Sequence, residues 1–497
     1  MNQVIKLTLQ KNWKVISLIA LAVLLRVFTI HQRGIWYDDA FSILLAKQPI
    51  MQILTGTAAD TMPPLYYILL HYWMKISTQI AWIRMLNLLI FMAMLGYVYY
   101  WVKQLSSGTA GLLAVFFCSI SPFLVYHSQE IRMYVMLAFF QVAYLYYFTR
   151  WSSSNVKKFT WLEMVICGAG ALYSHNLAIF GLVIPGVVLL IQRNYSVLWR
   201  WLKIFIASLI LFLPWLVFVP GQIQKIQTAF WTPRPGVLEV VQSIYSLFSF
   251  LPQPFPWVMI TGVLCFQLLG LVGWEFNKQR QQIAQRALIG LGMVFIPLVL
   301  FILSYFMRPV YVARGFILSG IVLYCLAGIL SARCWPTVFG KIIIGLMILI
   351  SSISLPFYYS FSSFPRSPFA QACADVNEQV GEQSEGIAVL HDNKLSSFPC
   401  VVYEPGLPQM FLGDETGSHN DTLALASQQA MQLFPEVSIQ EALKNKSQVY
   451  FFVFTRALDE YAELHTDVYP SLAYLDANFQ EIDVTYFNDL AVYQYAK

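Results

Sequence analysis

Charged residues are scarce in this chain of 497 residues. Asp, Glu, Lys and Arg make up 11% of it and apolar residues 58%, whereas ordinary soluble proteins have about 25% and about 45–50%. So few charges cannot cover a water-facing surface, which excludes a soluble enzyme and a disordered protein. The positive charges are scattered between apolar runs and do not gather on one face, which excludes a nucleic-acid partner as well.

Common metal-binding and catalytic motifs of soluble proteins are also missing. The seven cysteines form no CxxC motif of the metal-binding kind, and the chain has no internal repeat. Its C-terminal part has neither a glycine-rich phosphate loop nor a nucleophile elbow. Cys373 and Cys400 both lie in that part and can pair if it faces an oxidising compartment.

Acidic residues are few in the first three quarters of the chain. Residues 1–361 carry 25 Lys and Arg against 7 Asp and Glu, a net charge of +18. Residues 362–497 carry 6 and 19, a net charge of −13. The split predicts a membrane domain over 1–361, including a first outer loop over 31–81, and a soluble domain over 362–497.

Long apolar runs fill the membrane domain. A membrane-spanning helix needs about 20 mostly apolar residues, and the sequence predicts about eleven transmembrane helices. They lie near residues 13–30, 82–102, 109–126, 133–149, 159–175, 177–192, 203–220, 256–274, 287–306, 310–331 and 341–358. The first run resembles a signal peptide, but it contains Arg26 and no small-residue cleavage site follows, so we expect a retained anchor.

The basic residues predict the orientation. An odd number of spans puts the two chain ends on opposite sides of the membrane. A cytoplasmic N-terminus places 15 of the Lys and Arg residues near the spans inside and 8 outside, as the positive-inside rule requires. We therefore expect a multi-pass protein of the plasma (inner) membrane with an extracytoplasmic C-terminal domain.

The acids of the membrane domain sort to one side under this topology. Five of the seven fall on the outer side: Asp38, Asp39, Asp60, Glu130 and Glu239. Acids are costly near a bilayer and tend to be functional where they persist. The sequence therefore predicts chemistry on the outer face.

The soluble domain has the pattern of a small α/β domain. Short apolar runs at 387–390 and 449–454 predict buried strands, and 422–433 predicts a helix. Alternating residues at 482–486 and 490–495 predict a terminal strand pair.

The first outer loop contains the segment Trp36-Tyr-Asp-Asp-Ala-Phe-Ser42. Adjacent carboxylates beside a membrane can supply a general base, which favours Asp38 and Asp39 as catalytic residues. The alternative is a helix N-cap, because Asp before an apolar run is a good cap. The same loop holds a second acid in Asp60-Thr-Met-Pro-Pro-Leu-Tyr-Tyr67.

Two further outer segments carry polar residues. Glu130 and Arg132 can simply neutralise each other's charge. Alternatively, they belong to a site in which Arg132 faces a phosphate and Glu130 orders the site or a metal. His175 is either a packed, hydrogen-bonded residue or part of that site. Arg308 and Arg314 have no acid nearby in sequence, so lipid headgroups or a bound lipid phosphate or pyrophosphate must balance them.

The motifs together resemble a known family. In chain order they are Trp-x-Asp-(Asp/Glu)-Ala, x-Pro-Pro-Leu-Tyr-Tyr, Tyr-x-x-Gln-Glu-x-Arg-Met-Tyr, Leu213-Pro-Trp215, Trp231-x-x-Pro-Arg-Pro235 and Arg-Pro-x-Tyr-x-x-Arg. Over about residues 10–360 they are similar to the bacterial relatives of protein mannosyltransferases. That class of membrane glycosyltransferases has the C-type fold and includes the aminoarabinose–lipid A transferases.

The resemblance implies an activity and roles for residues. The family transfers a sugar from a polyprenyl-phosphate donor on the outer face, with inversion, to a lipid, glycan or protein acceptor. Asp38 matches the catalytic aspartate, and Asp39 stands where the family usually has Glu. Met62 replaces a frequent His, and the cofactor is left open between none and a divalent metal ion. Arg132, Arg308 and Arg314 match positions suited to binding the donor phosphate. The remaining substrate-binding or site-ordering residues are Asp60, Tyr66, Glu130, Tyr134, His175 and Tyr311.

Two alternatives to the glycosyltransferase remain. A transporter or flippase of lipid-linked saccharides usually shows two-fold repeats and broken helices at the midplane, whereas here the polar residues crowd the outer edge. A membrane-anchored assembly protein without activity would not need the acids of the first loop.

Overall fold

The computed structural model describes residues 2–153, 159–228, 232–249, 253–278, 283–360, 368–381, 385–414, 422–465 and 467–497. The chain divides into two compact units. One contains Met1–His31 and Thr61–Phe364, and the other contains Gln32–Asp60 and Pro365–Lys497. The second unit thus combines part of the first outer loop with the C-terminal part of the chain.

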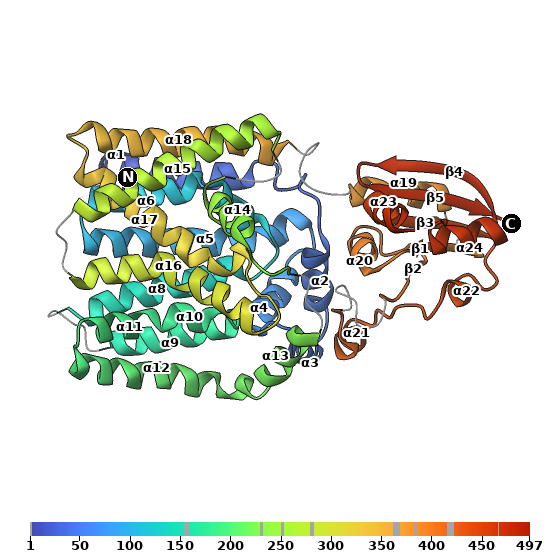
Figure 1. Ribbon diagram of the computed structural model, residues 1–497, viewed down its shortest axis with the longest axis horizontal. Helices are drawn as coiled ribbons and strands as arrows, with labels where there is room; N and C mark the ends of the chain where they lie inside the picture. The colour runs from blue at the N-terminus through green and yellow to red at the C-terminus, as the bar shows by residue number, and fades with distance from the viewer. Residues whose placement is uncertain are drawn as a thin grey trace. The chain divides into compact units, whose positions relative to one another are not determined.

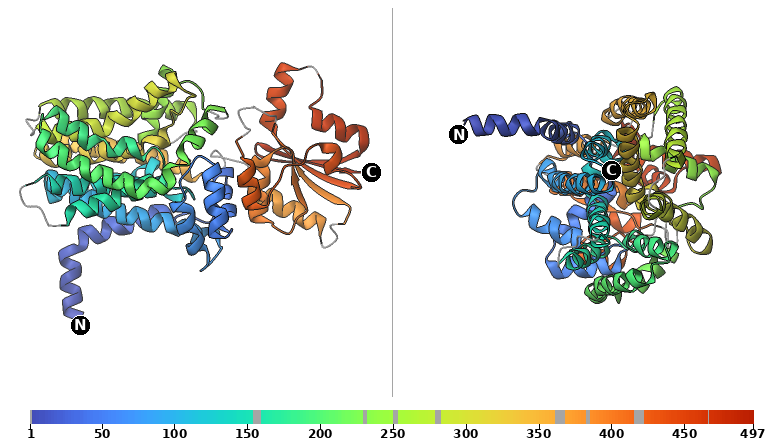
Figure 2. Two further views of the ribbon diagram at one scale, coloured as in Figure 1. Left: turned by 90° about the horizontal axis from the view of Figure 1, so that it is seen from below. Right: turned by 90° about the vertical axis from the view of Figure 1, so that its left-hand side faces the viewer.

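The first unit is helical. Its long helices lie side by side in a bundle (Figure 1), which the right-hand view of Figure 2 shows nearly along the helix axes. The helices are α1 (Asn2–Val27), α4 (Leu65–Met74), α5 (Ile80–Leu105), α6 (Gly108–Ile120), α7 (Pro122–Gln129), α8 (Tyr134–Trp151), α9 (Thr160–Ser174), α10 (Ala178–Leu182), α11 (Ile184–Ile191), α12 (Tyr195–Leu216), α13 (Val219–Thr228), α14 (Val237–Phe248), α15 (Phe255–Lys278), α16 (Ile283–Phe306), the 3₁₀ turn η1 (Ala313–Phe316), α17 (Ile317–Arg333) and α18 (Val338–Tyr359).

Each apolar run in the sequence coincides with a helix or a pair of helices. Within the described ranges, six helices are long and apolar enough to cross a membrane, or seven if the bent pair α6–α7 counts as one span. The chain is therefore a multi-pass membrane protein, while the number of about eleven spans stays a prediction. The predicted break in 159–192 is present, because α9 ends at Ser174 and α10 begins at Ala178.

Helix α17 lies in the interior of the bundle and packs closely on α6. Every residue of α17 from Ile317 to Ser331 is buried. A Cβ atom at Gly328 would lie 2.6 Å from the backbone nitrogen of Ala114. A glycine is needed there because the two helix backbones approach so closely.

A buried arginine stabilises the bend between α6 and α7. The two helices meet at 63°, and Pro122 at the start of α7 has no N–H to donate back to the carbonyl of Cys118. Arg26 of α1 replaces that donor. Its Nη2 donates to the carbonyl oxygen of Cys118 at 3.3 Å and its Nη1 to that of Ser119 at 2.9 Å. The predicted anchor helix therefore holds its charge inside the protein.

We expect Arg26→Met to destabilise the bundle markedly. The substitution keeps an unbranched side chain but leaves two buried carbonyls without their charged donor, and each such bond contributes about 1.5–3 kcal/mol. The thermal midpoint of the detergent-solubilised protein should fall by several degrees. Lys203→Met, at an exposed position on α12, removes one positive charge and should leave the midpoint unchanged. Equal midpoints for the two variants would contradict this role of Arg26.

The second unit contains a five-stranded sheet in the order β2-β1-β3-β5-β4. β1 pairs in parallel with β2 and β3, and the hairpin β4–β5 adds antiparallel strands. The elements are α2 (Tyr37–Ala46), α3 (Ile50–Ala59), α19 (Phe369–Val380), β1 (Ile387–His391), α20 (Lys394–Tyr403), β2 (Gln409–Phe411), α21 (Leu425–Met431), α22 (Ile439–Ala442), β3 (Gln448–Phe454), α23 (Thr455–Leu464), α24 (Pro470–Asn478), β4 (Gln480–Phe487) and β5 (Leu490–Ala496).

The four predicted strands are confirmed as β1, β3, β4 and β5. The short strand β2 was not predicted, because three residues carry too little periodicity. The helix predicted over 422–433 is shorter, since Ala424 is the N-cap of α21 and Gln432 after it has a left-handed backbone, with φ of 58°.

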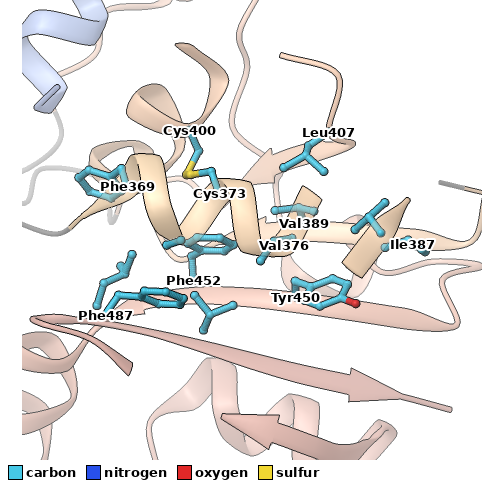
Figure 3. Packing of buried hydrophobic residues seen from close by; sticks show 14 residues of the cluster. Phe369, Cys373, Val376, Ile387, Val389, Cys400, Leu407, Tyr450, Phe452 and Phe487 are labelled. Carbon is cyan, nitrogen blue, oxygen red and sulfur yellow. A yellow bond between two sulfur atoms is a disulfide. The ribbon is translucent and has the colours of Figure 1, made fainter. Parts of the chain in front are cut away.

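Both faces of the sheet are covered by helices (Figure 2). Val389, Tyr450 and Phe452 face a core shared with α19 and α20 (Figure 3). Their neighbours Leu390 and Phe451 face the opposite core, with α22 and α24. Burial on both faces explains why the central strands are continuous apolar runs.

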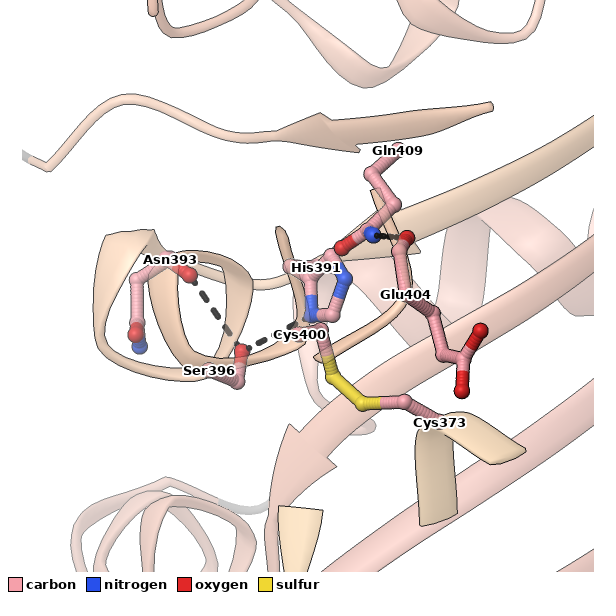
Figure 4. The surroundings of a disulfide bond; sticks show 7 residues. All are labelled: Cys373, His391, Asn393, Ser396, Cys400, Glu404 and Gln409. Carbon is pink, nitrogen blue, oxygen red and sulfur yellow. Dashed lines mark hydrogen bonds between the residues drawn. A yellow bond between two sulfur atoms is a disulfide. The ribbon is translucent and has the colours of Figure 1, made fainter. Parts of the chain in front are cut away.

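Cys373 of α19 and Cys400 of α20 form a disulfide (Figure 4). Both residues are fully buried, and their Cα atoms lie 5.8 Å apart. The pairing that the sequence left open is therefore present, and it ties together the two helices on one face of the sheet.

Candidate functional site

The acids of the first outer loop lie at the start of α2 in the second unit. The N-cap of α2 is Trp36, which makes no capping bond through its side chain. Asp38 and Asp39 lie in the first turn, where the helix dipole favours negative charge. Neither acid is therefore at the N-cap position. Asp39 is buried, with 3% of its surface exposed, whereas Asp38 is half-buried.

Asp60 ends α3 in the same unit. It is the C-cap residue, with an extended backbone, and its N–H donates to the carbonyl of Gly56. It is half-buried. Asp60 thus shares a compact unit with Asp38 and Asp39.

In the first unit, the short segment between α7 and α8 carries Glu130 and Arg132. Both are buried, with 6% and 5% of their surface exposed. Nδ1 of His127 lies 2.6 Å from Oε2 of Glu130. Nδ2 of Asn87 on α5 donates to the carbonyl of Glu130, and to that of Arg132 at 3.0 Å. Side chains from two helices therefore fix this segment.

Arg132 reaches the start of α4. Its Nη1 donates to the hydroxyl of Tyr67 at 3.3 Å, and the ring of Tyr67 lies 6.0 Å from that of Tyr66. Both tyrosines are fully buried. The motif Pro63-Pro64-Leu65-Tyr66-Tyr67 thus supplies a direct contact to the predicted phosphate ligand Arg132.

His175 and Arg314 both lie close to the ring of Tyr134. The guanidinium carbon of Arg314 lies 5.6 Å from the ring centre of Tyr134, and the ring of His175 lies 5.7 Å from the same ring. The charges of Arg132 and Arg314 both act on His175. Nδ1 of His175 accepts the N–H of Leu177 at 3.0 Å, which requires a lone pair there. His175 is thus packed and hydrogen-bonded, and it also lies beside the arginines.

We name this set the arginine cluster: Glu130, Arg132, Tyr134, His175 and Arg314, with His127 and Tyr67 as contacts. Its five members come from the α7–α8 segment, the start of α8, the C-cap of α9 and η1. Two guanidinium groups offer forked donors that match phosphate oxygens. The cluster therefore has the charge and the donors to bind an anionic headgroup.

Arg308 has a different environment. Its Nη1 donates to the carbonyl of Thr228 at 2.7 Å, and its N–H to Oε1 of Gln227 at 3.1 Å. It thereby satisfies the C-terminal end of α13, where helix carbonyls lack internal partners. Tyr311 packs against the rings of Phe301 and Phe316. The bonds to Gln227 and Thr228 give Arg308 a structural role, and its contact with the donor phosphate stays a prediction.

Sequence reasoning missed three contacts of the cluster. His127 stands three residues before Glu130 in the same motif, so its position was a usable signal. Tyr67 lies in the Pro-Pro-Leu-Tyr-Tyr motif, although only Tyr66 was singled out. Asn87 lies in an apolar helix without any motif, and only the folded structure identifies it. Trp231 of the Pro-Arg-Pro motif lies outside the described residues.

The described residues contain no preformed metal-binding site. No three His, Cys, Asp or Glu side chains lie together there in a way that could hold a metal ion.

Comparisons with known proteins show that this chain resembles several solved structures in fold. No family model matches the sequence, and no curated protein matches it. Among solved structures, ArnT from Cupriavidus metallidurans bound to undecaprenyl phosphate is similar over 97% of this chain and 98% of its own, with a TM-score of 0.65 and 12% identity. The oligosaccharyltransferase AglB from Archaeoglobus fulgidus, in complex with an inhibitory peptide and a dolichol-phosphate, is similar over 98% of this chain and 74% of its own, with a TM-score of 0.54 and 12% identity.

Both likenesses cover the helical part and the C-terminal part together, and both proteins are membrane transferases with the C-type fold. The predicted resemblance is thereby confirmed at the level of fold. This chain has the C-type glycosyltransferase fold.

Proposed function

We propose that this protein is an integral membrane glycosyltransferase that takes a sugar from a polyprenyl-phosphate donor. The observation that carries the proposal is the likeness, over nearly the whole of both chains, to a transferase solved with undecaprenyl phosphate. The arginine cluster supports it, because it offers a phosphate two guanidinium groups. A shared fold alone does not imply a shared function, so the site residues must carry the chemistry.

The proposed step is a single displacement at the anomeric carbon. The hydroxyl oxygen of the acceptor attacks that carbon, the bond from the carbon to the phosphate oxygen breaks, and the configuration inverts. The proton of the hydroxyl passes to the carboxylate of Asp38, acting as general base. The electron pair of the broken bond leaves with the polyprenyl phosphate.

The leaving phosphate gains negative charge in this step. Arg132 and Arg314 are the residues proposed to stabilise it, since preorganised donors aimed at developing charge contribute strongly to catalysis. Glu130, held by His127, and Tyr134 would keep the arginines oriented. Asp39 and Asp60 are proposed to order the surroundings of Asp38, and Tyr66 and Tyr311 to line the substrate site.

The proposed side of the membrane is the extracytoplasmic one. Residues 32–60 and 365–497 form one compact unit, so Asp38 and the Cys373–Cys400 disulfide lie on the same side. Disulfides persist in oxidising compartments, which supports an outer location for both. An even number of crossings must then separate residues 60 and 365, as the ten spans predicted there provide.

The proposal predicts transfer activity in vitro. Purified protein is incubated with a panel of polyprenyl-phosphate sugars and with lipid, glycan and peptide acceptors, and products are identified by mass spectrometry. We expect one donor to yield a glycosylated acceptor and free polyprenyl phosphate in equal amounts. Movement of intact donor across vesicle membranes, without any transfer, would instead identify a flippase and contradict the proposal.

A further inference from the structure

The segment that leads into the proposed base is held by the C-terminal part of the chain. Three consecutive residues before Asp38 each contact α19 or α20. The backbone N–H of Ile35 donates to the hydroxyl of Tyr403 at 2.9 Å. These contacts lie within one compact unit, although the two residues of the Ile35–Tyr403 bond are 368 positions apart in the sequence.

Aromatic contacts continue the attachment. The ring of Trp36 lies 6.0 Å from the ring of Phe369 at the start of α19 and 6.0 Å from that of Phe454 at the end of β3. The ring of Tyr37 lies 5.3 Å from that of Phe398 on α20. Trp36 thereby packs against the core on the face of the sheet that α19 and α20 cover.

A second attachment lies at the far end of the loop. The hydroxyl of Ser427 on α21 donates to the carbonyl of Gly56 on α3 at 3.0 Å. A Cβ atom at Gly56 would lie 3.1 Å from Cβ of Ala430, so glycine allows α3 and α21 to approach. Residues 32–60 are thus held at both ends, with Asp38 and Asp39 between.

The disulfide lies on the same two helices as Phe369 and Phe398. Cys373 is four residues after Phe369 on α19, so the two share a helix face. Cys400 is two residues after Phe398 on α20. The bond therefore joins α19 and α20, the two helices whose aromatic rings contact Trp36 and Tyr37. Figure 4 shows the bond itself.

We propose that α19 and α20, joined by the Cys373–Cys400 disulfide, form a clamp that positions Asp38 for proton abstraction. This inference rests on the proposed function of Asp38. A general base must be held in a productive geometry, and displacement by an ångström can slow a reaction strongly. Phe398 and Tyr403 are then positioning residues, which act through Ile35–Tyr37 on the base.

The test uses the full-length protein and three variants on the domain side of the clamp: Phe398→Leu, Tyr403→Phe, and the double variant Cys373→Ala with Cys400→Ala. Phe451→Leu is the matched control, because Phe451 is equally buried on the opposite face of the sheet. It removes the same ring and should destabilise the domain to a similar degree. Tyr403→Phe keeps the ring and removes the hydroxyl that accepts the N–H of Ile35, so it will fold even if the others do not.

We expect Phe398→Leu and the double cysteine variant to lower kcat by roughly fivefold to tenfold, with the donor KM within twofold of wild type. Tyr403→Phe should lower kcat by about threefold, in line with the loss of one hydrogen bond. In the clamp variants the acid limb of the pH profile of kcat should also shift. Phe451→Leu should change neither kcat nor the pH profile.

The outcomes separate the two proposals. If Asp38→Asn loses transfer while Phe398→Leu and Tyr403→Phe behave like Phe451→Leu, the clamp is overturned and the base stands. If Asp38→Asn transfers as wild type does, the role of Asp38 fails, and the clamp fails with it. Equal loss of kcat in Phe398→Leu and Phe451→Leu, without a shift in pH profile, shows that the contacts only stabilise the domain.

Discussion

Replacing Asp38 by Asn is expected to lower the rate of sugar transfer by a factor of about 10²–10⁴, the usual contribution of general acid–base catalysis. Asn keeps the shape of the side chain and can still form hydrogen bonds, but it cannot take the proton of the acceptor. The loss should appear in kcat under saturating donor and acceptor. Single-turnover transfer with a radiolabelled donor measures it directly.

The same substitution should leave the fold nearly unchanged. Because α2 begins after Trp36, Asp38 lies in the first turn and not at the N-cap, and a negative charge in the first turn is worth about 0.3–1 kcal/mol. Detergent extraction and the thermal midpoint should therefore stay close to wild type. If Asp38 has only a structural role, Asp38→Asn should instead retain most of the transfer rate. That result would exclude Asp38 as the general base.

Asp39→Asn is the companion measurement. Asp39 is the more buried of the two acids, with 3% of its surface exposed. Neighbouring residues on a helix point in different directions, so both acids cannot face the acceptor equally. We expect a smaller loss of kcat than in Asp38→Asn. A larger loss would assign the role of base to Asp39.

Local patterns in the sequence predict most of the elements. Apolar runs near 20 residues long indicate the helices because lipid requires every backbone polar group to be paired within the segment. The strands at 387–390 and 449–454 are predictable because burial on both faces makes them continuously apolar. The bend after Ile120 was not predicted from the apolar run. Pro122 marks it locally, but the donor that stabilises it, Arg26, comes from a helix far away in the sequence.

The packing of residues 32–60 with the C-terminal part has no local signal. From the sequence alone, Trp36 and Tyr37 are aromatic residues of a loop at the membrane surface, between two predicted spans. Their partners Phe369 and Phe398 lie more than 300 residues later, where nothing in the sequence marks them as contacts. Pairing between distant segments is fixed by shape and burial, which a single sequence does not reveal.

The candidate site was predicted where its residues share a motif. Glu130, Arg132 and Tyr134 lie within five positions, and the structure brings them together with His175 and Arg314. Arg308 was grouped with Arg314 because they lie six residues apart at the same membrane edge. The chain between them is an irregular segment followed by η1, where such spacing does not imply a shared direction, and Arg308 points to the end of α13.

Arg314→Ala is expected to lower kcat/KM for the polyprenyl-phosphate donor by roughly ten- to a hundredfold. A charge-assisted hydrogen bond to phosphate contributes about 1.5–3 kcal/mol, and its loss appears in the specificity constant. The fold should persist, because Arg314 is half-buried and lies beside the ring of Tyr134. Initial rates over a range of donor concentrations in detergent measure the effect, and Lys75→Ala, an exposed cation in the same unit, controls for the lost charge.

Arg308→Ala separates a phosphate contact from a structural one. Removing its guanidinium leaves the carbonyl of Thr228 without its charged donor, so we expect a lower thermal midpoint together with any loss of donor use. Arg314→Ala should instead lose donor use at an unchanged midpoint. If only lipid headgroups balance the charge of Arg314, the donor kinetics of Arg314→Ala in detergent would match those of Lys75→Ala. Such a match would remove Arg314 from the donor site and leave Arg132, with its bond to Tyr67, as the remaining proposed phosphate ligand of the cluster.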